Sequence, residues 1–372
     1  MILDEVCELI IDTEHKTAPN VEVGIPSIRT PNVGKGRLIL DKDIKFVDEP
    51  TFIEWTKRAI PRKDDLIIAR EAPVGNVAIV PDIQLCLGQR TVLARPDIQK
   101  VNPVYLCYYL LSPKMQHKML SGSGGSTVAH LNMKDIRNLE LETIPSLPTQ
   151  RKIAAILSAY DDLIENNLKR VRLLEEKAQL YYKELMHESS KWERVRLEEF
   201  VSVVKGRKPE NVLEQPEEGC QLYLLLDTVE RGKTLFTLDL TLPQSKLTDV
   251  LMCMDGARSG LAFRGMVGAI GSTMAIWRSN SQRISGEFLY QFMKQNESAI
   301  TQGNTGAAIP HANRKFILDM KIAMPPKNEA NIFERLTTPI NKLINIIHSQ
   351  NTKLREARDI LLPRLMNGEI VL

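Results

Sequence analysis

Two stretches of the chain carry mostly apolar residues at alternating spacings of four and three, which is the pattern of a coiled-coil seam. The first stretch comprises Tyr160, Ile164, Asn167, Val171, Leu174, Ala178, Tyr181 and Leu185. The same rhythm returns in Ile340, Ile344, Ile347, Asn351, Leu354, Arg358, Leu361 and Leu365, each exactly 180 residues further along the chain. Asn167, Asn351 and Arg358 interrupt the seams, and Pro363 is expected to kink or end the second helix near its last turn. The pattern predicts two long helices that bury their seams against each other.

Short β-rich runs, separated by turn residues, fill the segments that precede the two helices. Residues 76–80 and 221–225 are examples, and short helices are expected near 105–111 and 287–293. Each segment is therefore predicted to be a compact α+β globule with a twisted, mostly antiparallel sheet.

The chain also contains a long internal repeat. A shift of 181 residues brings a G-x-x-G-x-x-x-x-H-x-N-x-K-x-I pattern into register: Gly122, Gly125, His130, Asn132, Lys134 and Ile136 match Gly303, Gly306, His311, Asn313, Lys315 and Ile317. Asp65-Leu66-Ile67-Ile68 likewise resembles Asp249-Val250-Leu251-Met252. Proline-containing hinges at 144–148 and 324–326 follow the repeated pattern. The predicted domains are a first globule at 1–145, a helix at 146–190, a second globule at 191–325 and a helix at 326–372.

The order of globule, helix, globule and helix constrains the geometry. A helix over residues 151–186 is about 54 Å long at 1.5 Å per residue. The first helix carries the chain away from the first globule, so the second helix can cover its seam only by running back. The prediction is a pair of antiparallel helices with a globule near each end, related by a pseudo-twofold axis. Such a spacer suits duplex DNA, whose groove presentation repeats about every 34–36 Å. The simpler alternative is ordinary helix packing within one larger α+β protein.

Two segments resemble the conserved spacer helices in the specificity subunit of Type I restriction-modification enzymes. They are 147–162, LPTQRKIAAILSAYDD, followed by Ile164-Glu165-Asn166-Asn167, and the terminal 361–370, LLPRLMNGEI. The resemblance covers essentially the whole chain and implies two target recognition domains joined by two antiparallel helices. The second hinge departs from the family pattern, because Glu329-Ala330-Asn331 stands where the first has Gln150-Arg151.

The resemblance also implies a function and a set of partners. The chain is expected to be a noncatalytic subunit that binds double-stranded DNA, and each globule would read one half of an asymmetric bipartite target. The helices would seat two methyltransferase subunits, which bind AdoMet and methylate adenine. The complex would also contain restriction subunits that use ATP and Mg²⁺. No cofactor is expected on this chain. The alternative function is a coiled-coil repeat scaffold without DNA recognition.

Donors suited to phosphates and base edges cluster on glycine-punctuated loops in both globules. The first globule offers His15, Lys16, Thr17, Arg29, Asn32, Lys35, Arg37, Arg70, Arg90, Ser123 and Ser126. The second offers Lys205, Arg207, Lys208, Arg231, Lys233, Arg258, Ser272, Asn304 and Thr305. Each residue alone is better explained by a solvated surface, and only the clusters favour DNA. The glycine loops at 121–127 and 302–306 are equally explained as structural turns. His130, Asn132 and Lys134 alternate as one face of a strand would, and either line the DNA or hold the loop.

Composition and motifs exclude several other classes. The 49 Lys and Arg nearly balance the 46 Asp and Glu, so attraction to a polyanion must come from local patches. Five scattered cysteines without a C-x-x-C favour a reducing cytoplasm over a disulfide scaffold or thiolate zinc site, and the acidic start is not expected to be a secretory signal. Asn102-Pro103-Val104-Tyr105 only partly matches the N-P-P-Y loop of amino-methyltransferases and reads better as a helix N-terminus. A Walker A motif and metal-ligand spacing of the six histidines are also missing from the sequence.

Overall fold

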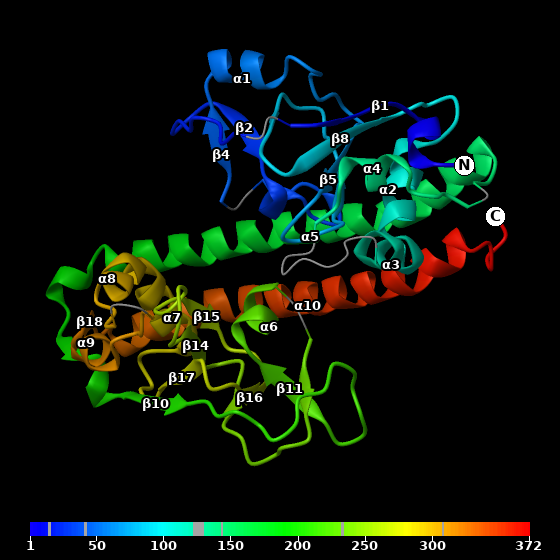
Figure 1. Cartoon of the computed structure of the whole chain (residues 1–372). Helices are drawn as coiled ribbons and strands as arrows, with labels where there is room; N and C mark the ends of the chain where they lie inside the picture. The colour runs from blue at the N-terminus through cyan, green and yellow to red at the C-terminus, as the bar shows by residue number, and fades with distance from the viewer. Residues whose placement is uncertain (14–15, 41–42, 122–129, 143, 232–233, 307–308) are drawn as a thin grey trace. The chain divides into compact units, whose positions relative to one another are not determined.

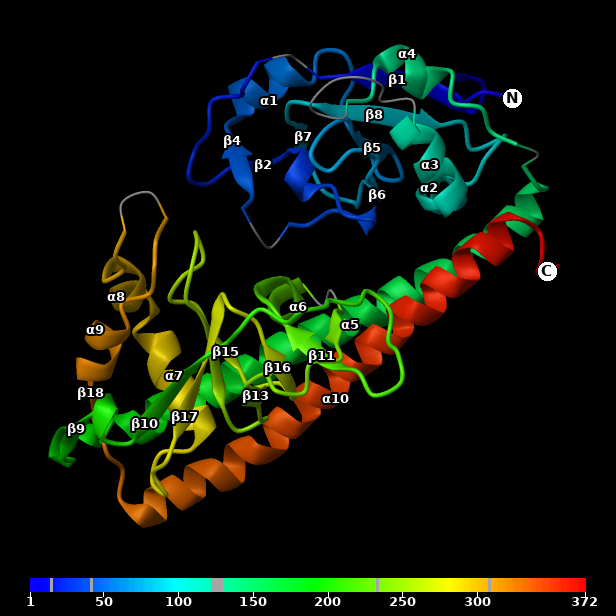
Figure 2. The same ribbon diagram turned by 60° about the horizontal axis from the view of Figure 1, so that its bottom comes forward.

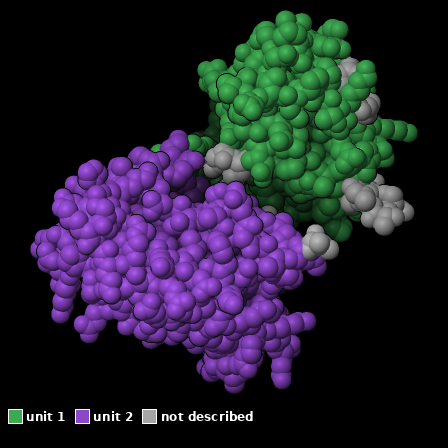
Figure 3. Space-filling view, turned by 90° about the vertical axis from the view of Figure 1, so that its left-hand side faces the viewer, with its two compact units in different colours: residues 1–166, 353–372 green, residues 167–352 purple. Residues whose placement is uncertain are grey.

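The computed structural model describes residues 1–13, 16–40, 43–121, 130–142, 144–231, 234–306 and 309–372, without the side chains of 230–231. The chain forms two compact units. Unit 1 comprises residues 1–166 and 353–372, and unit 2 comprises residues 167–352 (Figure 3). Each unit therefore contains one globule together with part of both long helices. The sequence-based boundaries, which separate globules from helices, divide the chain differently.

Unit 1 is built on a five-stranded, mostly antiparallel sheet in the order β1-β8-β5-β6-β3, beside a three-stranded sheet in the order β4-β2-β7. Its elements are β1 (Cys7–Asp12), β2 (Ile25–Ile28), β3 (Gly36–Arg37), β4 (Lys45–Val47), α1 (Glu49–Trp55), β5 (Leu66–Ala69), β6 (Val77–Ile79), β7 (Cys86–Leu87), β8 (Thr91–Pro96), α2 (Pro103–Leu111), α3 (Pro113–Ser121) and α4 (Met133–Arg137). Asn102 caps α2 by accepting a hydrogen bond from the Tyr105 amide at 2.9 Å, which confirms the helix N-terminus predicted there.

The alternation of side chains along β5 explains why this sheet is buried on both faces. Leu66 and Ile68 pack with Tyr105, Leu106 and other residues of α2 and α3, which lie beside the sheet in both ribbon views (Figures 1 and 2). Ile67 and Ala69 face the opposite way and form a second cluster with residues of β2 and β7.

Unit 2 repeats this plan with a four-stranded sheet in the order β10-β17-β14-β15 and another in the order β12-β11-β16-β13. Val250 and Met252 of β14 face a cluster that contains α7, while Leu251 and Cys253 face the other sheet. The elements are β9 (Arg194–Arg196), β10 (Val201–Lys205), β11 (Gln221–Leu224), α6 (Leu226–Arg231), β12 (Phe236–Thr237), β13 (Gln244–Ser245), β14 (Val250–Cys253), β15 (Ala262–Arg264), β16 (Gly268–Ile270), β17 (Met274–Ser279), α7 (Gly286–Gln295), α8 (Glu297–Gln302), α9 (Arg314–Asp319) and β18 (Lys321–Ala323).

The long helices α5 (Leu147–Met186) and α10 (Lys327–Met366) each contain 40 residues, and α10 continues three residues past Pro363. Within unit 2 they lie side by side (Figures 1 and 2). Asn167 donates to Asn351 at 2.8 Å, and the Tyr182 ring lies 6.2 Å from that of Phe333. From the first pair to the second, the residue number rises along α5 and falls along α10. The helices are therefore antiparallel in this unit. The mixed α+β fold with long helices confirms the predicted fold class.

The predicted seam residues are all buried or half-buried in the structure. Val171, Ala178, Ile340, Ile344 and Ile347 form one cluster in unit 2, with Leu174 and Tyr181 packed against it. In unit 1, Leu361 and Leu365 pack instead with the globule and with the first half of α5. No helix in the described ranges is both long and apolar enough to cross a bilayer.

Candidate nucleic-acid interface

In unit 1 the histidine of the repeated pattern is fixed to the end of strand β5. The Leu131 amide donates to the Arg70 carbonyl at 3.1 Å, and the Arg70 guanidinium donates to the Leu131 carbonyl at 2.8 Å. The His130 ring lies between Arg70, 2.7 Å from its Nε2, and Glu71, 2.6 Å from its Nδ1. Arg90 completes the group with an ion pair to Glu71 at 2.7 Å. Side chains from three separate parts of the sequence therefore meet at one strand end: Arg70 with Glu71, Arg90, and His130.

In unit 2 the same backbone contacts recur around His311. The Ala312 amide donates to the Met254 carbonyl, and the Met254 amide donates to the Thr273 carbonyl, both at 2.8 Å. The corresponding bonds in unit 1 join Leu131 to Arg70 and Arg70 to Arg90. The His311 ring binds Asp255 through Nδ1 at 2.8 Å, and Lys205 lies 3.8 Å from the same carboxylate. A histidine–carboxylate pair with a nearby cation is thus present in both units.

An ion pair to a buried aspartate lies at the opposite end of each of these strands. Arg95 donates twice to Asp65, at 2.8 Å and 2.8 Å, and Arg278 donates twice to Asp249, at 2.7 Å and 2.7 Å. Each carboxylate also accepts a backbone amide from three residues upstream. The hydrogen bonds to the carboxylates raise the pKa of both guanidinium groups. The alignment of Asp65 with Asp249 was visible in the sequence, but their arginine partners were not identified there.

The residues that follow the histidines are helical, so the strand expected over 130–134 is wrong. Asn132 and Asn313 occupy the N-cap positions of α4 and α9. Asn313 accepts a hydrogen bond from the Phe316 amide at 3.1 Å, which satisfies one of the free amides at the helix start. An asparagine before an apolar helical run is itself a helix-start signal, and here it outweighs the alternating pattern.

The structure divides the remaining candidates of unit 1 between surface and interior. Lys16, Thr17, Lys35 and Arg90 are exposed. Asn32 is buried, where it accepts from the Arg29 amide and donates to the Ile39 carbonyl. Arg29 itself donates to the Asp43 carbonyl at 2.7 Å. His15, Ser123 and Ser126 lie outside the described residues.

In unit 2 several candidates converge on one cavity of about 610 Å³. Arg258 and Asn304 line it, and Thr305 is exposed beside it. The Asn304 amide group donates to the carbonyl and hydroxyl of Ser259, at 2.9 and 2.8 Å, which ties the repeated glycine segment to the turn between β14 and β15. The cavity is lined by Ala257, Arg258, Ser259, Leu261, Glu297, Thr301, Asn304, Gly306 and Pro310.

The other described candidates of unit 2 lie near the end of β10, because the Gly206 and Arg207 amides donate to the carbonyls of Met274 and Ile270, on either side of Ser272. Lys205, Arg207 and Lys208 are exposed at the end of β10, and Ser272 is half-buried. Arg207 donates to the Thr241 carbonyl at 2.5 Å. The Arg231 side chain and Lys233 lie outside the described residues.

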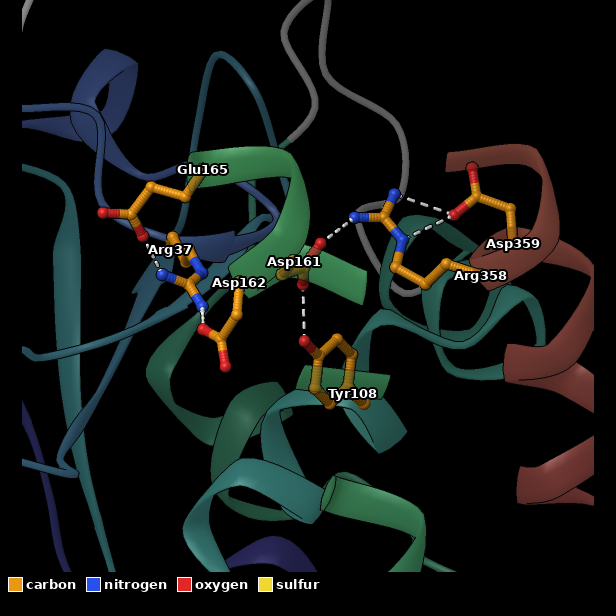
Figure 4. Close-up of polar contacts among 7 residues, drawn as sticks. All are labelled: Arg37, Tyr108, Asp161, Asp162, Glu165, Arg358 and Asp359. Carbon is orange, nitrogen blue, oxygen red and sulfur yellow. Dashed lines mark hydrogen bonds and ion pairs between the residues drawn. The ribbon is translucent and has the colours of Figure 1, made fainter. Parts of the chain in front are cut away.

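A polar network attaches the globule of unit 1 to both long helices (Figure 4). Asp161 of α5 accepts hydrogen bonds from Tyr108 of α2 and from Arg358 of α10, both at 2.5 Å. Burial disfavours the charge of Arg358, but Asp161 and Asp359 outweigh it and raise the pKa of the guanidinium. Arg37, a candidate for DNA contact, instead forms ion pairs with Asp162 and Glu165 of α5. The charged seam position Arg358 is thus explained by a buried acidic partner.

The globule of unit 2 is attached mainly through aromatic rings. Tyr182 of α5, Phe288 of α7 and Phe333 of α10 pack edge to face, with centroids 5.0 to 6.2 Å apart. Arg264 adds a polar contact to Glu287 at 2.8 Å and to Glu175 of α5 at 2.9 Å.

The two hinges are also held differently, in line with their difference in sequence. Gln150 is buried, accepts from the Asn102 amide at 2.7 Å and donates to the Pro145 carbonyl at 2.8 Å. At the second hinge, Arg283 donates to the carbonyls of Pro325 and Met324, at 2.7 and 3.0 Å. At the second hinge, Arg283 of the globule therefore binds the hinge carbonyls, as Gln150 of α5 does at the first hinge.

Comparison with known proteins gives a consistent result. Residues 3–175 match the family model described as "Type I restriction modification DNA specificity domain". The chain is similar to the MjaVIII specificity subunit of Methanocaldococcus jannaschii, with 27% identity over 47% of this chain and 41% of that relative. It is 24% identical to the MjaIX specificity subunit of the same organism over 90% of this chain and 83% of the relative.

The fold is similar to that of a Type I restriction-modification S subunit from M. genitalium. The TM-score is 0.58 at 14% identity, and the alignment covers 98% of this chain and 95% of that one. The family model and the two relatives confirm the resemblance inferred from the sequence, and the solved structure supports the fold alone.

Proposed function

We propose, from the identification of this chain as a Type I restriction-modification specificity subunit, that it selects the DNA sequence on which partner subunits act. Each globule reads one half of a bipartite DNA target. The long helices set the separation of the half-sites and seat the methyltransferase subunits. The chain itself performs no catalysis, and AdoMet, ATP and Mg²⁺ are bound by its partners.

The observation that carries this proposal is the duplicated histidine–carboxylate and aspartate–arginine framework. A framework kept in two copies supports two reading heads of the same type. The side chains around it differ: Arg70 and Arg90 in unit 1 correspond to Met254 and Thr273 in unit 2. Because base recognition depends on which donors and acceptors reach the groove, unlike surroundings favour two different half-sites. The target is therefore asymmetric.

Exposed apolar side chains on the long helices support a docking role. Leu163, Leu173 and Leu180 of α5 and Ile346 and Ile360 of α10 are each more than half exposed. Exposure of large aliphatic side chains to water is unfavourable. These helices already bury a seam, so the additional apolar residues favour contact with protein partners. We assign these exposed residues of the two units to contacts with two methyltransferase subunits, and the complete complex adds restriction subunits.

The complex is proposed to act in the cytoplasm. The five cysteines are free thiols, which suits a reducing compartment without structural disulfides.

Binding of duplex DNA by the complex reconstituted with its methyltransferase subunits tests the proposal. Phosphate contacts predict an affinity that falls steeply and log-linearly as salt rises. A scaffold without a DNA role would show no such binding, or a flat dependence on salt.

The spacer role is tested by inserting matched heptads into α5 and α10. The reconstituted complex is then expected to methylate targets with a wider gap between unchanged half-sites. A change in the bases, with the gap unchanged, would contradict the role of the helices.

A further inference from the structure

The two repeat-related histidines differ in the number of ring nitrogens that the fold occupies. In unit 1, Arg70 lies 2.7 Å from Nε2 of His130. A guanidinium has only donors, so Nε2 must accept, and the ring proton is on Nδ1, where it bonds Glu71 at 2.6 Å. Both nitrogens of His130 are therefore used inside the unit, and its side chain is 32% exposed.

In unit 2, Met254 stands where unit 1 has Arg70, and a thioether cannot donate a hydrogen bond. Asp255 holds Nδ1 of His311 at 2.8 Å, which places the ring proton on that nitrogen. Within the described part of the chain, Nε2 of His311 has no hydrogen-bond partner. The side chain is 50% exposed. The second histidine is thus oriented on one edge and open on the other.

The segment around Thr305 and Gly306 holds the His311 ring next to the cavity of unit 2. The backbone amide of His311 donates to the Thr305 carbonyl at 2.7 Å, and the Thr305 amide donates back at 2.9 Å. Gly306 has a φ of +93°, and a Cβ there would lie 2.3 Å from the Ile309 carbonyl oxygen and 3.1 Å from Cδ2 of His311. Only glycine allows the loop to lie this close to the ring. Gly306 and Pro310 line the cavity together with Arg258.

We propose that His311 contacts DNA directly through Nε2 and determines specificity in the second half-site, whereas His130 is a positioning residue. This inference rests on the proposed function. With the proton on Nδ1, Nε2 is an acceptor whose complement in the major groove is the exocyclic amino group of adenine or cytosine. Asp255 sets the tautomer and the ring orientation. Arg258 and Lys205 supply positive charge for the neighbouring phosphates.

The first test compares His311→Ala with His130→Ala in the reconstituted complex. Affinities are measured for the native target and for duplexes substituted at each position of each half-site. His311→Ala is expected to weaken binding to the native target roughly tenfold and to abolish the base preference at one position of the second half-site. His130→Ala is expected to lower the melting temperature and to weaken binding to all duplexes to a similar degree, without abolishing the base preference at any one position.

If His311→Ala lowered the affinity for all duplexes equally, the inference would be overturned in favour of a phosphate contact by His311. Unchanged affinity and preference would show that His311 does not touch DNA. If the wild-type complex binds no duplex, the proposed function fails as well. If sequence-specific binding is unaltered in His311→Ala, the inference about His311 is wrong and the proposed function still holds.

The second test uses Met254→Arg, which copies the Arg70 contact into unit 2. The new guanidinium is expected to occupy Nε2 of His311 and so to weaken binding roughly tenfold, although it adds a positive charge to a DNA-binding protein. In the double variant with His311→Ala, Met254→Arg should cause no further loss. Stronger binding by the single variant would contradict the inference. Thermal unfolding checks the fold of Met254→Arg, and His311→Ala remains an independent test because it alters an exposed side chain.

Discussion

The two units keep the same buried framework but are attached to the long helices by different chemistry. Asp65–Arg95 in unit 1 and Asp249–Arg278 in unit 2 use the same pairs of atoms, at nearly the same distances. The helix contacts do not correspond: unit 1 relies on the charged group around Asp161, and unit 2 on an aromatic cluster around Tyr182. The duplication has therefore preserved the contacts that define each globule, while contacts to the helices and to the surface have diverged.

The largest expected effect comes from removing the shared carboxylate in unit 1. Asp65→Ala leaves a mostly buried guanidinium and a backbone amide without their acceptor, and is expected to cost about 3–5 kcal/mol of unfolding free energy. Asp249→Ala should cost less, about 2–3 kcal/mol, because Arg278 is 33% exposed whereas Arg95 is 12% exposed. Urea denaturation of the full chain measures both values.

Asp82→Ala provides the control for this comparison, since Asp82 is an exposed aspartate of the same globule. It should change the unfolding free energy by less than about 0.5 kcal/mol. If Asp249→Ala lowered the unfolding free energy more than Asp65→Ala, the expected order of the two ion pairs would be wrong.

The charged attachment of unit 1 is tested at Asp161. Asp161→Ala removes the acceptor of both Tyr108 and Arg358, and is expected to cost about 2–3 kcal/mol, since Arg358 keeps Asp359 as a partner. The neighbouring Asp162→Ala breaks an exposed ion pair with Arg37 and should cost less than about 1 kcal/mol. Equal losses from the two variants would show that the buried contacts of Asp161 drawn in Figure 4 contribute no more to stability than an exposed ion pair.

The smallest effects separate two buried tyrosines. Tyr108→Phe loses a hydrogen bond to the Asp161 carboxylate and should cost about 1.5 kcal/mol, less than Asp161→Ala, because Asp161 keeps Arg358 as a donor. Tyr182→Phe should be neutral or slightly stabilising, because the Tyr182 hydroxyl is buried without a hydrogen-bond partner in the described structure. Thermal unfolding of the two variants checks the contrast. A destabilised Tyr182→Phe protein would reveal a polar contact of the aromatic cluster that this structure lacks.

The sequence predicted those features that depend on local pattern. The heptad spacing located α5 and α10, and β-rich runs located β6 and β11. The internal repeat predicted that the two globules would share a plan. Each of these signals is contained in a short segment or in a repeat at a fixed sequence separation. It can therefore be recognised without knowing how the strands pair.

The ion pairs depend on strand pairing and could not be predicted in the same way. Asp65 meets Arg95 because β5 lies beside β8 in the register that places Leu66 opposite Ala94. Arg37 was expected at a DNA surface because a lone arginine on a glycine loop has the same local signature whether it meets phosphate or a helix. Its acidic partners on α5 lie more than a hundred residues away.

The central claim is that two related but unlike globules each read their own half of one target. Mapping of methylated bases in cells that express this chain with its methyltransferase subunits tests it most directly. The account predicts methylation within a bipartite sequence whose two halves differ and are separated by a gap of constant length. A single uninterrupted target, or two identical halves, would contradict it.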